Sequence, residues 1–136
     1  MIKIAITDDH PLLLEGLKNI LSQQEDFDVI GCYASAEELF IGLGNNEIDI
    51  LLLDINLADS NSIDSIKPIL AKSPSLNIIM LSVHNEFAVI NSALYEGAKG
   101  YIQKNASIEE IILGIQTILE GKKFLCSQTK SIVEKK

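Results

Sequence analysis

The sequence predicts an α/β fold, in which a doubly wound parallel sheet of five strands carries helices on both faces. Two observations support this class. Strand-like and helix-like segments alternate five times, and each connection is long enough to cross over between parallel strands. The central segment, residues 50–53, is apolar at every position, which is typical of a strand buried on both faces.

The strands are indicated by short runs rich in β-branched and other apolar residues, bounded by polar or turn-forming ones. They are expected at residues 2–6, 29–34, 50–54, 76–82 and 100–103. The run at residues 50–54 is unusual because it ends in a carboxylate, Asp54. From this stretch alone, Asp54 could equally start a loop or cap a helix, or it could mark a functional site at a strand end.

The helices are indicated by apolar residues at helical spacing. They are expected at about residues 11–23, 36–44, 63–70, 87–96 and 108–120. Pro11 suits a first helical turn, and Ser35 and Ser107 each open a capping box, with glutamate three residues later. Gly97 and Gly121 are placed to end the last two helices.

Two segments depart from this regular alternation. Residues 57–62 are turn-formers and predict a polar loop after the central strand. Pro68 lies inside the apolar pattern of the next helix, which we therefore expect to start late or to bend. Residues after about Lys122 are polar and rich in lysine, so we expect one domain at residues 1–121 and a linker or tail at residues 122–136.

Composition indicates one folded domain that does not bind nucleic acid by itself. The 136 residues are 47% hydrophobic, and the formal net charge is −8. Every basic residue is lysine, because the chain contains no arginine. An acidic surface repels phosphate backbones, and the arginine fork that reads guanine is missing.

The cysteines and the apolar segments favour a cytoplasmic protein. Cys32 and Cys126 are far apart in sequence and form no metal-binding pattern, so we expect free thiols in a reducing compartment. The chain does not start with a cationic and apolar leader. No apolar run approaches the ~18 residues of a membrane span, and no membrane association is expected.

Polar residues stand where four of the expected strands end. Asp8 and Asp9 follow the first strand, Asp54 the third, Ser82 the fourth and Lys104 the fifth. Since the carboxyl ends of parallel strands share one edge of a sheet, these side chains should converge. Crowded carboxylates need a cation, and Mg²⁺ prefers oxygen ligands. With an ammonium and a hydroxyl beside them, they suit phosphoryl transfer, in which a carboxylate can be the nucleophile.

The motifs at these strand ends resemble a known family. They are Asp8-Asp9-His10-Pro11 with Gly16-Leu17, Leu53-Asp54-Ile55, Leu81-Ser82-Val83-His84, and Gly97-Ala98-Lys99-Gly100-Tyr101 before Lys104. Residues 1 to about 121 resemble the CheY-like receiver domain of response regulators, in particular the NarL/FixJ (LuxR-type) class. The resemblance implies a flavodoxin-like (βα)5 fold with strand order 2-1-3-4-5.

The resemblance also implies roles for the acidic residues. Asp54 would be the phosphoacceptor and would take a phosphoryl group from a sensor histidine kinase. Mg²⁺ would be the cofactor, held by Asp8, Asp9 and Asp54, directly or through water. The backbone carbonyl of Asn56 would complete the ligands that the protein supplies.

Three other residues receive roles from the resemblance. Ser82 and Lys104 would bind the phosphoryl group. Tyr101 would be the aromatic residue that changes orientation when Ser82 is drawn toward that group. The implied protein is a signalling phosphoacceptor and not an enzyme, although it would catalyse its own phosphorylation and dephosphorylation.

Several positions depart from the family pattern. Leu57 and Ala58 replace the usual Met-Pro after the acceptor, and Ser62 replaces a glycine. Val83 is larger than the usual residue, and Asn105 replaces a common proline. These departures keep open a degenerate receiver that acts only as an interaction module.

A phosphatase or phosphotransferase that works through an aspartyl phosphate is the less favoured alternative. Such enzymes generally need a second acid two residues after the nucleophile, and Asn56 stands there instead. They also need a cap or pocket, for which the chain has too few residues.

The helices and the end of the chain suggest partners. Leu12, Leu14 and Leu113 lie off the buried stripes of their helices, so the first and last helices could form a homodimer surface. Regulators of this class usually carry a helix-turn-helix output domain after the receiver. We see none in this sequence, and we expect a truncated transcriptional regulator or a stand-alone receiver.

Overall fold

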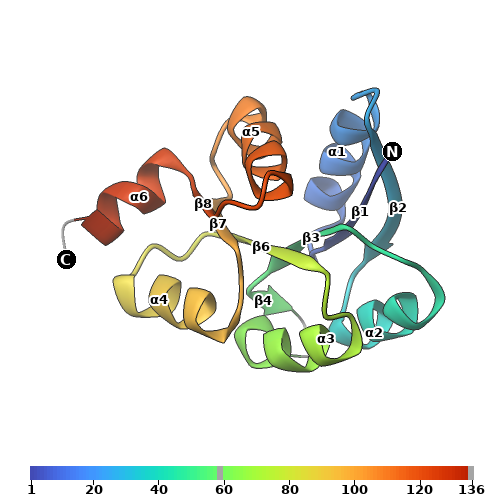
Figure 1. Ribbon diagram of the computed structural model, residues 1–136, viewed down its shortest axis with the longest axis horizontal. Coiled ribbons are helices and arrows are strands. Elements are labelled where there is room, and N and C mark those ends of the chain that lie inside the picture. Colours follow the sequence, from blue (N-terminus) through green and yellow to red (C-terminus); the bar gives the residue numbers. More distant parts are fainter. Residues whose placement is uncertain (58–59, 135–136) are drawn as a thin grey trace.

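The computed structural model describes residues 1–57 and 60–134, and they form a layered α/β domain (Figure 1). Its main sheet has the strand order β2-β1-β3-β6-β7-β8, and all neighbouring strands are parallel. The strands are β1 (Ile2–Thr7), β2 (Phe27–Tyr33), β3 (Ile50–Asp54), β6 (Asn77–Ser82), β7 (Gly100–Gln103) and β8 (Phe124–Leu125). The parallel α/β class is therefore as predicted, but a sheet of only five strands is not, because β8 extends its edge beyond β7.

Helices cover both faces of the sheet. They are α1 (Pro11–Ser22), α2 (Ala36–Asn45), α3 (Ile66–Lys72), α4 (Phe87–Glu96), α5 (Ile108–Leu119) and α6 (Ser127–Glu134). Helices α1 and α5 lie on one face, and α2, α3 and α4 lie on the other (Figure 1). Among the described residues, no helix is long and apolar enough to cross a membrane.

Strand β3 lies at the centre of both apolar cores. Ile50 and Leu52 face the core under α1 and α5, whereas Leu51 and Leu53 face the core under α2, α3 and α4. All four side chains are buried. Because successive side chains of a strand point to opposite faces, a strand between two helical layers must be apolar at each position. The apolar run at residues 50–53 therefore correctly predicted a strand buried on both faces.

The structure confirms the glycines that were predicted to end two helices. It confirms the capping box predicted at Ser107 only in part. Gly97 and Gly121 follow α4 and α5 with φ angles of 125° and 89°, which favour glycine. Ser107 Oγ accepts a hydrogen bond from Glu110 N at 3.2 Å. The Glu110 carboxylate, however, accepts hydrogen bonds from the Ser127 N–H and hydroxyl at 2.8 and 3.1 Å. The second capping box is thus wrong for the glutamate, which binds the start of α6 instead.

The segment after β3 is more ordered than a polar loop. Strands β4 (Asn56–Leu57) and β5 (Ser60–Asn61) pair in antiparallel fashion. A short 3-10 helix (Ser62–Ser65) follows and delays the start of α3, as Pro68 in its first turn predicted. Of the positions that depart from the family pattern, Ala58 lies outside the described residues.

The segment expected to be a linker or tail folds back onto the sheet. The N–H groups of Phe124 and Cys126 donate to the carbonyls of Lys99 and Tyr101 at 3.0 and 3.2 Å, which forms β8 beside β7. Helix α6 then packs against β7 and α4. Cys32 and Cys126 are both free thiols, as predicted, and Cys126 is buried.

Candidate functional site

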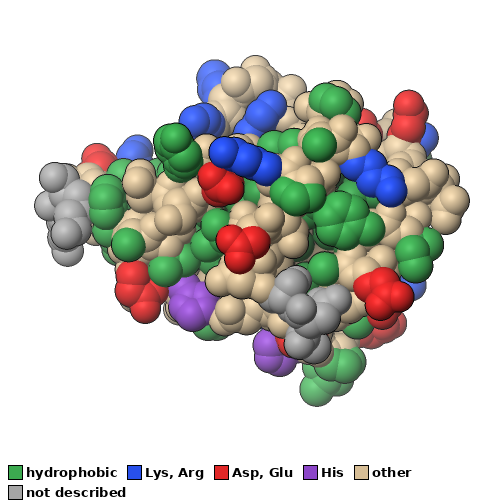
Figure 2. Space-filling model, turned by 90° about the horizontal axis from the view of Figure 1, so that it is seen from below, with side chains coloured by type: hydrophobic (Ala, Val, Ile, Leu, Met, Phe, Trp, Pro, Cys, Tyr) green, Lys and Arg blue, Asp and Glu red, His purple; other side chains and the backbone are tan. Residues whose placement is uncertain are grey.

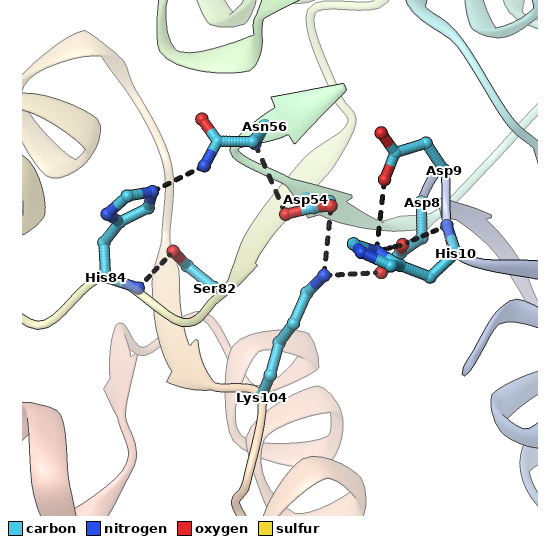
Figure 3. A network of polar contacts seen from close by, with 8 residues as sticks. All are labelled: Asp8, Asp9, His10, Asp54, Asn56, Ser82, His84 and Lys104. Carbon is cyan, nitrogen blue, oxygen red and sulfur yellow. Dashed lines mark hydrogen bonds and ion pairs between the residues drawn. The ribbon is translucent and has the colours of Figure 1, made fainter. Parts of the chain in front are cut away.

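The carboxyl ends of four adjacent strands place polar side chains at one edge of the sheet (Figure 3). Asp54 and Ser82 are the last residues of β3 and β6, and Asp8 and Lys104 directly follow β1 and β7. Asp8, Asp54 and Ser82 are almost fully buried. The apolar strands below them therefore hold three polar groups at the bottom of the site.

Lys104 connects two of the carboxylates. Its Nζ lies 3.0 Å from Asp8 Oδ2 and 3.0 Å from Asp54 Oδ2. The Lys104 side chain is only 11% exposed, and the two carboxylates are 1% and 5% exposed. One ammonium group therefore compensates two buried carboxylates, which leaves excess negative charge if both are ionised.

The pKa values of this group reflect that imbalance. Burial raises the pKa of Asp54 and the Asp8 charge adds to it, while the hydrogen bond from Lys104 acts against them without cancelling the shift. Burial alone would lower the pKa of Lys104, but Asp8 and Asp54 outweigh it and raise that pKa. The site therefore favours a protonated lysine and has a place for further positive charge.

Asp9 and His10 complete an acidic cluster beside Lys104. Ligand atoms of Asp8, Asp9, His10 and Asp54 all lie within 4.8 Å of one another. His10 Nδ1 is 2.9 Å from Asp8 Oδ1 and 3.1 Å from Asp9 Oδ1. His10 directly precedes α1, and its ring contacts both acids.

The oxygen atoms of this cluster fit a magnesium ion. Two buried oxygens make no hydrogen bond: Asp9 Oδ1 has only its contact with His10 Nδ1, and Asp8 Oδ2 has only its ion pair with Lys104. A buried oxygen without a hydrogen bond costs free energy unless a cation or water binds it. Since Mg²⁺ is held by one or two carboxylates together with waters and phosphate oxygens, Asp8, Asp9 and Asp54 are suitable ligands.

Asn56 and His84 form the rim of the site. The Asn56 N–H donates to Asp54 Oδ1 at 3.3 Å, and the Asn56 amide lies 2.6 Å from His84 Nε2. Both histidines lie along one edge of the surface, with acidic side chains nearby (Figure 2). Nothing in the local sequence pattern around His84 indicated its contact with Asn56.

The backbone of His84 forms hydrogen bonds with the side chains of three residues. Two of them, Ser82 and Tyr101, were expected at the site from the sequence, and the third, Gln103, was not. Its N–H donates to Ser82 Oγ at 2.9 Å. Its carbonyl accepts hydrogen bonds from the Tyr101 hydroxyl at 2.9 Å and from Gln103 Nε2 at 3.2 Å. Tyr101 is fully buried, and burial raises its pKa against an opposing effect of Ser82. The only sequence signal for Gln103 was a polar residue at the end of an otherwise apolar strand.

The positions that depart from the family pattern differ in burial, and at one of them, Ser62, the hydroxyl is buried without a hydrogen bond. Ser62 is buried, and its N–H donates to the Ile55 carbonyl at 2.7 Å. Among the described residues, no residue other than glycine has a positive φ, so serine at this position causes no backbone strain. Leu57 is buried, whereas Val83 is 68% exposed at the rim.

A pocket of about 610 Å³ opens beside Lys104. It lies between α1, the loop after β6 and helix α6, which contribute Leu13, Val83 and Ile132. Lys104 is the residue that this pocket shares with the acidic site, since Asp8, Asp9 and Asp54 do not line it.

Comparisons with known proteins agree with this geometry. Residues 4–116 match the response regulator receiver domain family. The chain is 38% identical over 121 residues to the transcriptional regulatory protein LnrK of Bacillus subtilis (strain 168), which covers 89% of this chain and 55% of LnrK. It is 32% identical over 127 residues to the transcriptional regulatory protein MctR of Rhizobium johnstonii, which covers 93% of this chain and 59% of MctR. The chain thus spans little more than half the length of these curated relatives.

Solved structures share the complete fold. The isolated REC domain of RcsB from Salmonella enterica serovar Typhimurium, in the presence of the phosphomimetic BeF3−, superposes with a TM-score of 0.89. It is 26% identical, and the match covers 97% of this chain and 98% of that one. RcsB in a complex with DNA gives a TM-score of 0.92 at 27% identity, and the match covers 99% of this chain and 68% of that one.

Proposed function

The chain belongs to the response regulator receiver domain family, and from this premise we propose that Asp54 accepts a phosphoryl group from the phosphohistidine of a sensor histidine kinase. The observation that carries the proposal is the position of Asp54 at the end of β3, with Lys104 Nζ 3.0 Å from its Oδ2. A carboxylate held in this way is fixed in orientation, and its second oxygen, Oδ1, accepts a hydrogen bond from the Asn56 N–H.

The proposed reaction needs few groups from the protein. An Asp54 oxygen forms a bond to phosphorus, the bond from phosphorus to the kinase imidazole nitrogen breaks, and that imidazole takes up a proton. Lys104 and the Ser82 hydroxyl bind the phosphoryl oxygens, which positions the group and offsets its charge. Asp8, Asp9 and Asp54, with the Asn56 carbonyl, would hold Mg²⁺, and the bound ion would offset negative charge on the phosphoryl oxygens.

We assign the domain to a longer regulatory protein. Residues 1–121 carry the receiver motifs, and β8 and α6 continue the chain along the same sheet. The support is that LnrK and MctR, which this chain matches over little more than half their length, are transcriptional regulatory proteins. We infer that phosphorylation of Asp54 controls transcription through a part of the protein outside this sequence.

Mass spectrometry of the intact protein tests the central step. After incubation with Mg²⁺ and acetyl phosphate, the chain should gain one phosphoryl group, and Asp54→Asn should gain none. Asp28→Asn, which changes an exposed aspartate on β2, is the matched control and should react like the parent chain. An unmodified parent chain, or equal modification of Asp54→Asn, would contradict the proposal.

A further inference from the structure

Helix α6 is held on the receiver by buried contacts. Ile132 and Val133 pack against the core cluster that lies under α4. Thr129 is fully buried, and so is Cys126 directly before the helix. At the start of the helix, the Glu110 carboxylate of α5 binds Ser127. Helix α6 is therefore a docked element whose removal would expose apolar surface and a thiol.

Gln103 lies at the centre of the polar part of this interface. Its side chain is buried at the end of β7, and Nε2 lies 3.2 Å from the His84 carbonyl and 3.4 Å from Thr129 Oγ1. The Gln103 N–H donates to Cys126 Sγ at 3.3 Å, and this sulfur lies 3.2 Å from Thr129 Oγ1. Because a buried amide is costly without partners, Gln103 depends on both His84 and α6.

The His84 end of this contact belongs to the phosphoryl-binding loop. Ser82 Oγ, the proposed phosphoryl ligand, accepts the His84 N–H at 2.9 Å. The same residue offers its carbonyl to Gln103. A continuous set of hydrogen bonds therefore runs from Ser82 through the backbone of His84 and the amide of Gln103 to Thr129 of α6.

We propose that Gln103 is a positioning residue that links occupancy of Asp54 to the docking of helix α6. The Ser82 hydroxyl donates to a phosphoryl group on Asp54, and Ser82 Oγ moves toward that group. This movement breaks the hydrogen bond that Oγ accepts from the His84 N–H and shifts the His84 carbonyl. Gln103 then loses one of its two side-chain acceptors, and its contact with Thr129 weakens. In the unmodified state, α6 covers the surface formed by α4 and β7. After modification of Asp54, α6 leaves this surface more often, and the surface is exposed to solvent.

The structure leaves room for this movement. The pocket of about 610 Å³ beside Lys104 lies between the loop after β6 and α6, and Gln103 is one of its lining residues. The loop can therefore shift without entering the packed core. The Tyr101 hydroxyl donates to the same His84 carbonyl, so a shift of this carbonyl acts on Tyr101 as well as on Gln103. Only Gln103 also contacts α6, through Thr129.

Reactivity of the Cys126 thiol measures docking of α6 directly. In a Cys32→Ser background, Cys126 is the remaining thiol, and a disulfide reagent such as DTNB reaches it only when α6 opens. Mg²⁺ with beryllofluoride, a stand-in for the phosphoryl group, should accelerate its modification roughly two- to twelve-fold, which corresponds to the loss of one hydrogen bond. In Gln103→Leu, Cys126 should be modified rapidly even without beryllofluoride, and beryllofluoride should not increase this rate further.

Two controls keep the result specific. Gln116→Leu changes an exposed glutamine of α5 and should behave like the parent chain. Thr129→Val removes the other end of the contact and should reproduce Gln103→Leu. If Gln103→Leu fails to fold, judged by circular dichroism, Thr129→Val provides the same test from the helix side.

The inference rests on the proposed function, and its failure can be distinguished from a failure of that function. Fluorine NMR reports beryllofluoride binding independently of Cys126. If beryllofluoride binds and Cys126 reactivity does not change, the link through Gln103 is wrong while the phosphoacceptor site stands. If beryllofluoride does not bind, both are wrong. A beryllofluoride effect that is as large in Gln103→Leu as in the parent chain would also overturn the role of Gln103.

Discussion

Lys104 Nζ lies 3.0 Å from Asp54 Oδ2, although the two residues are 50 positions apart in the sequence. The same ammonium lies 3.0 Å from Asp8 Oδ2. Parallel strand ends make this possible, because β1, β3 and β7 deliver their next residues to one edge of the sheet. Lys104 thus stabilises two buried carboxylates, one of which is the proposed phosphoacceptor Asp54.

Replacing Lys104 by methionine should destabilise the protein when no metal is present. The change leaves two buried carboxylates without their cation, and breaking a buried ion pair from one side costs on the order of 3 kcal/mol. Thermal unfolding in EDTA should therefore show a lower midpoint for Lys104→Met. Lys99→Met, at an exposed lysine before β7, should have little effect. An unchanged midpoint for Lys104→Met would show that the carboxylates are compensated in another way.

The raised pKa of Asp54 predicts how stability depends on pH. Folded Asp54 keeps its proton to a higher pH than the unfolded chain does, so between the two pKa values the folded state binds more protons. The contribution of this residue to the free energy of unfolding therefore decreases as pH rises through that range. Asp54→Asn removes this effect and should raise the unfolding midpoint at neutral pH.

The difference between Asp54→Asn and the parent chain should become smaller in acid. Below the ordinary aspartate pKa of about 3.9, both states of the parent chain are protonated at Asp54, and no ionisation penalty remains. Calorimetry in EDTA from neutral pH to about pH 3 measures the difference. An Asp54→Asn variant that is less stable than the parent at neutral pH would contradict the direction assigned to this pKa.

The sequence predicted the central strand and the helix ends well because their requirements involve only residues close together in the sequence. Ile50 to Leu53 must be apolar if helices cover both faces of β3, and Gly97 and Gly121 stand where helices need a positive φ. These requirements are visible in a short stretch of residues. The edge of the sheet that gathers the polar residues follows from the same alternation of strands and helices.

The missed features depend on contacts between distant residues. Strand β8 is two residues long, which is too short to show a periodic sequence pattern. It forms because the N–H groups of Phe124 and Cys126 donate to carbonyls on β7 and just before it. The local pattern predicted that the Glu110 carboxylate accepts a hydrogen bond within a capping box. In the structure it accepts hydrogen bonds from Ser127 at the start of α6 instead. Gln103 likewise has no local partner that could have indicated its contacts with His84 and Thr129.

Magnesium binding separates a working receiver from a degenerate one. If Asp8, Asp9 and Asp54 hold Mg²⁺, the ion should raise the unfolding midpoint, since a ligand at 100 times its Kd stabilises by about 2.7 kcal/mol. Asp9→Asn removes a carboxylate whose buried Oδ1 makes no hydrogen bond and contacts only His10 Nδ1, and it should weaken Mg²⁺ binding at least tenfold. Calorimetric titration measures both effects.

The control for magnesium binding is Asp64→Asn, which lies in the short 3-10 helix outside the acidic cluster. Its Mg²⁺ affinity should equal that of the parent chain. Equal affinity in Asp9→Asn as well would place the ion elsewhere, and an absence of Mg²⁺ binding in the parent would favour the degenerate receiver.

The exposed leucines of α1 and α5 predict a dimer surface on one face of the sheet. Leu12 is 91% exposed and Leu113 is 52% exposed, and their helices lie next to each other (Figure 1). Leu14, which the sequence grouped with them, is partly buried against the core instead. Burial of a leucine side chain contributes about 1.5–3 kcal/mol, so a symmetric contact that buries Leu113 twice would gain a substantial part of its affinity from this residue.

Sedimentation velocity at micromolar concentration, with Mg²⁺ and beryllofluoride, tests this surface. The parent chain should form a dimer, and Leu113→Ser should shift the equilibrium to monomer by at least tenfold in Kd, because the contact loses apolar burial in both protomers. Ile41→Ser, which changes a side chain that is 60% exposed on α2 at the opposite face, is the matched control and should leave the dimer intact. A monomeric parent chain under these conditions would exclude a dimer in this range, and equal effects of the two variants would place the contact on another face.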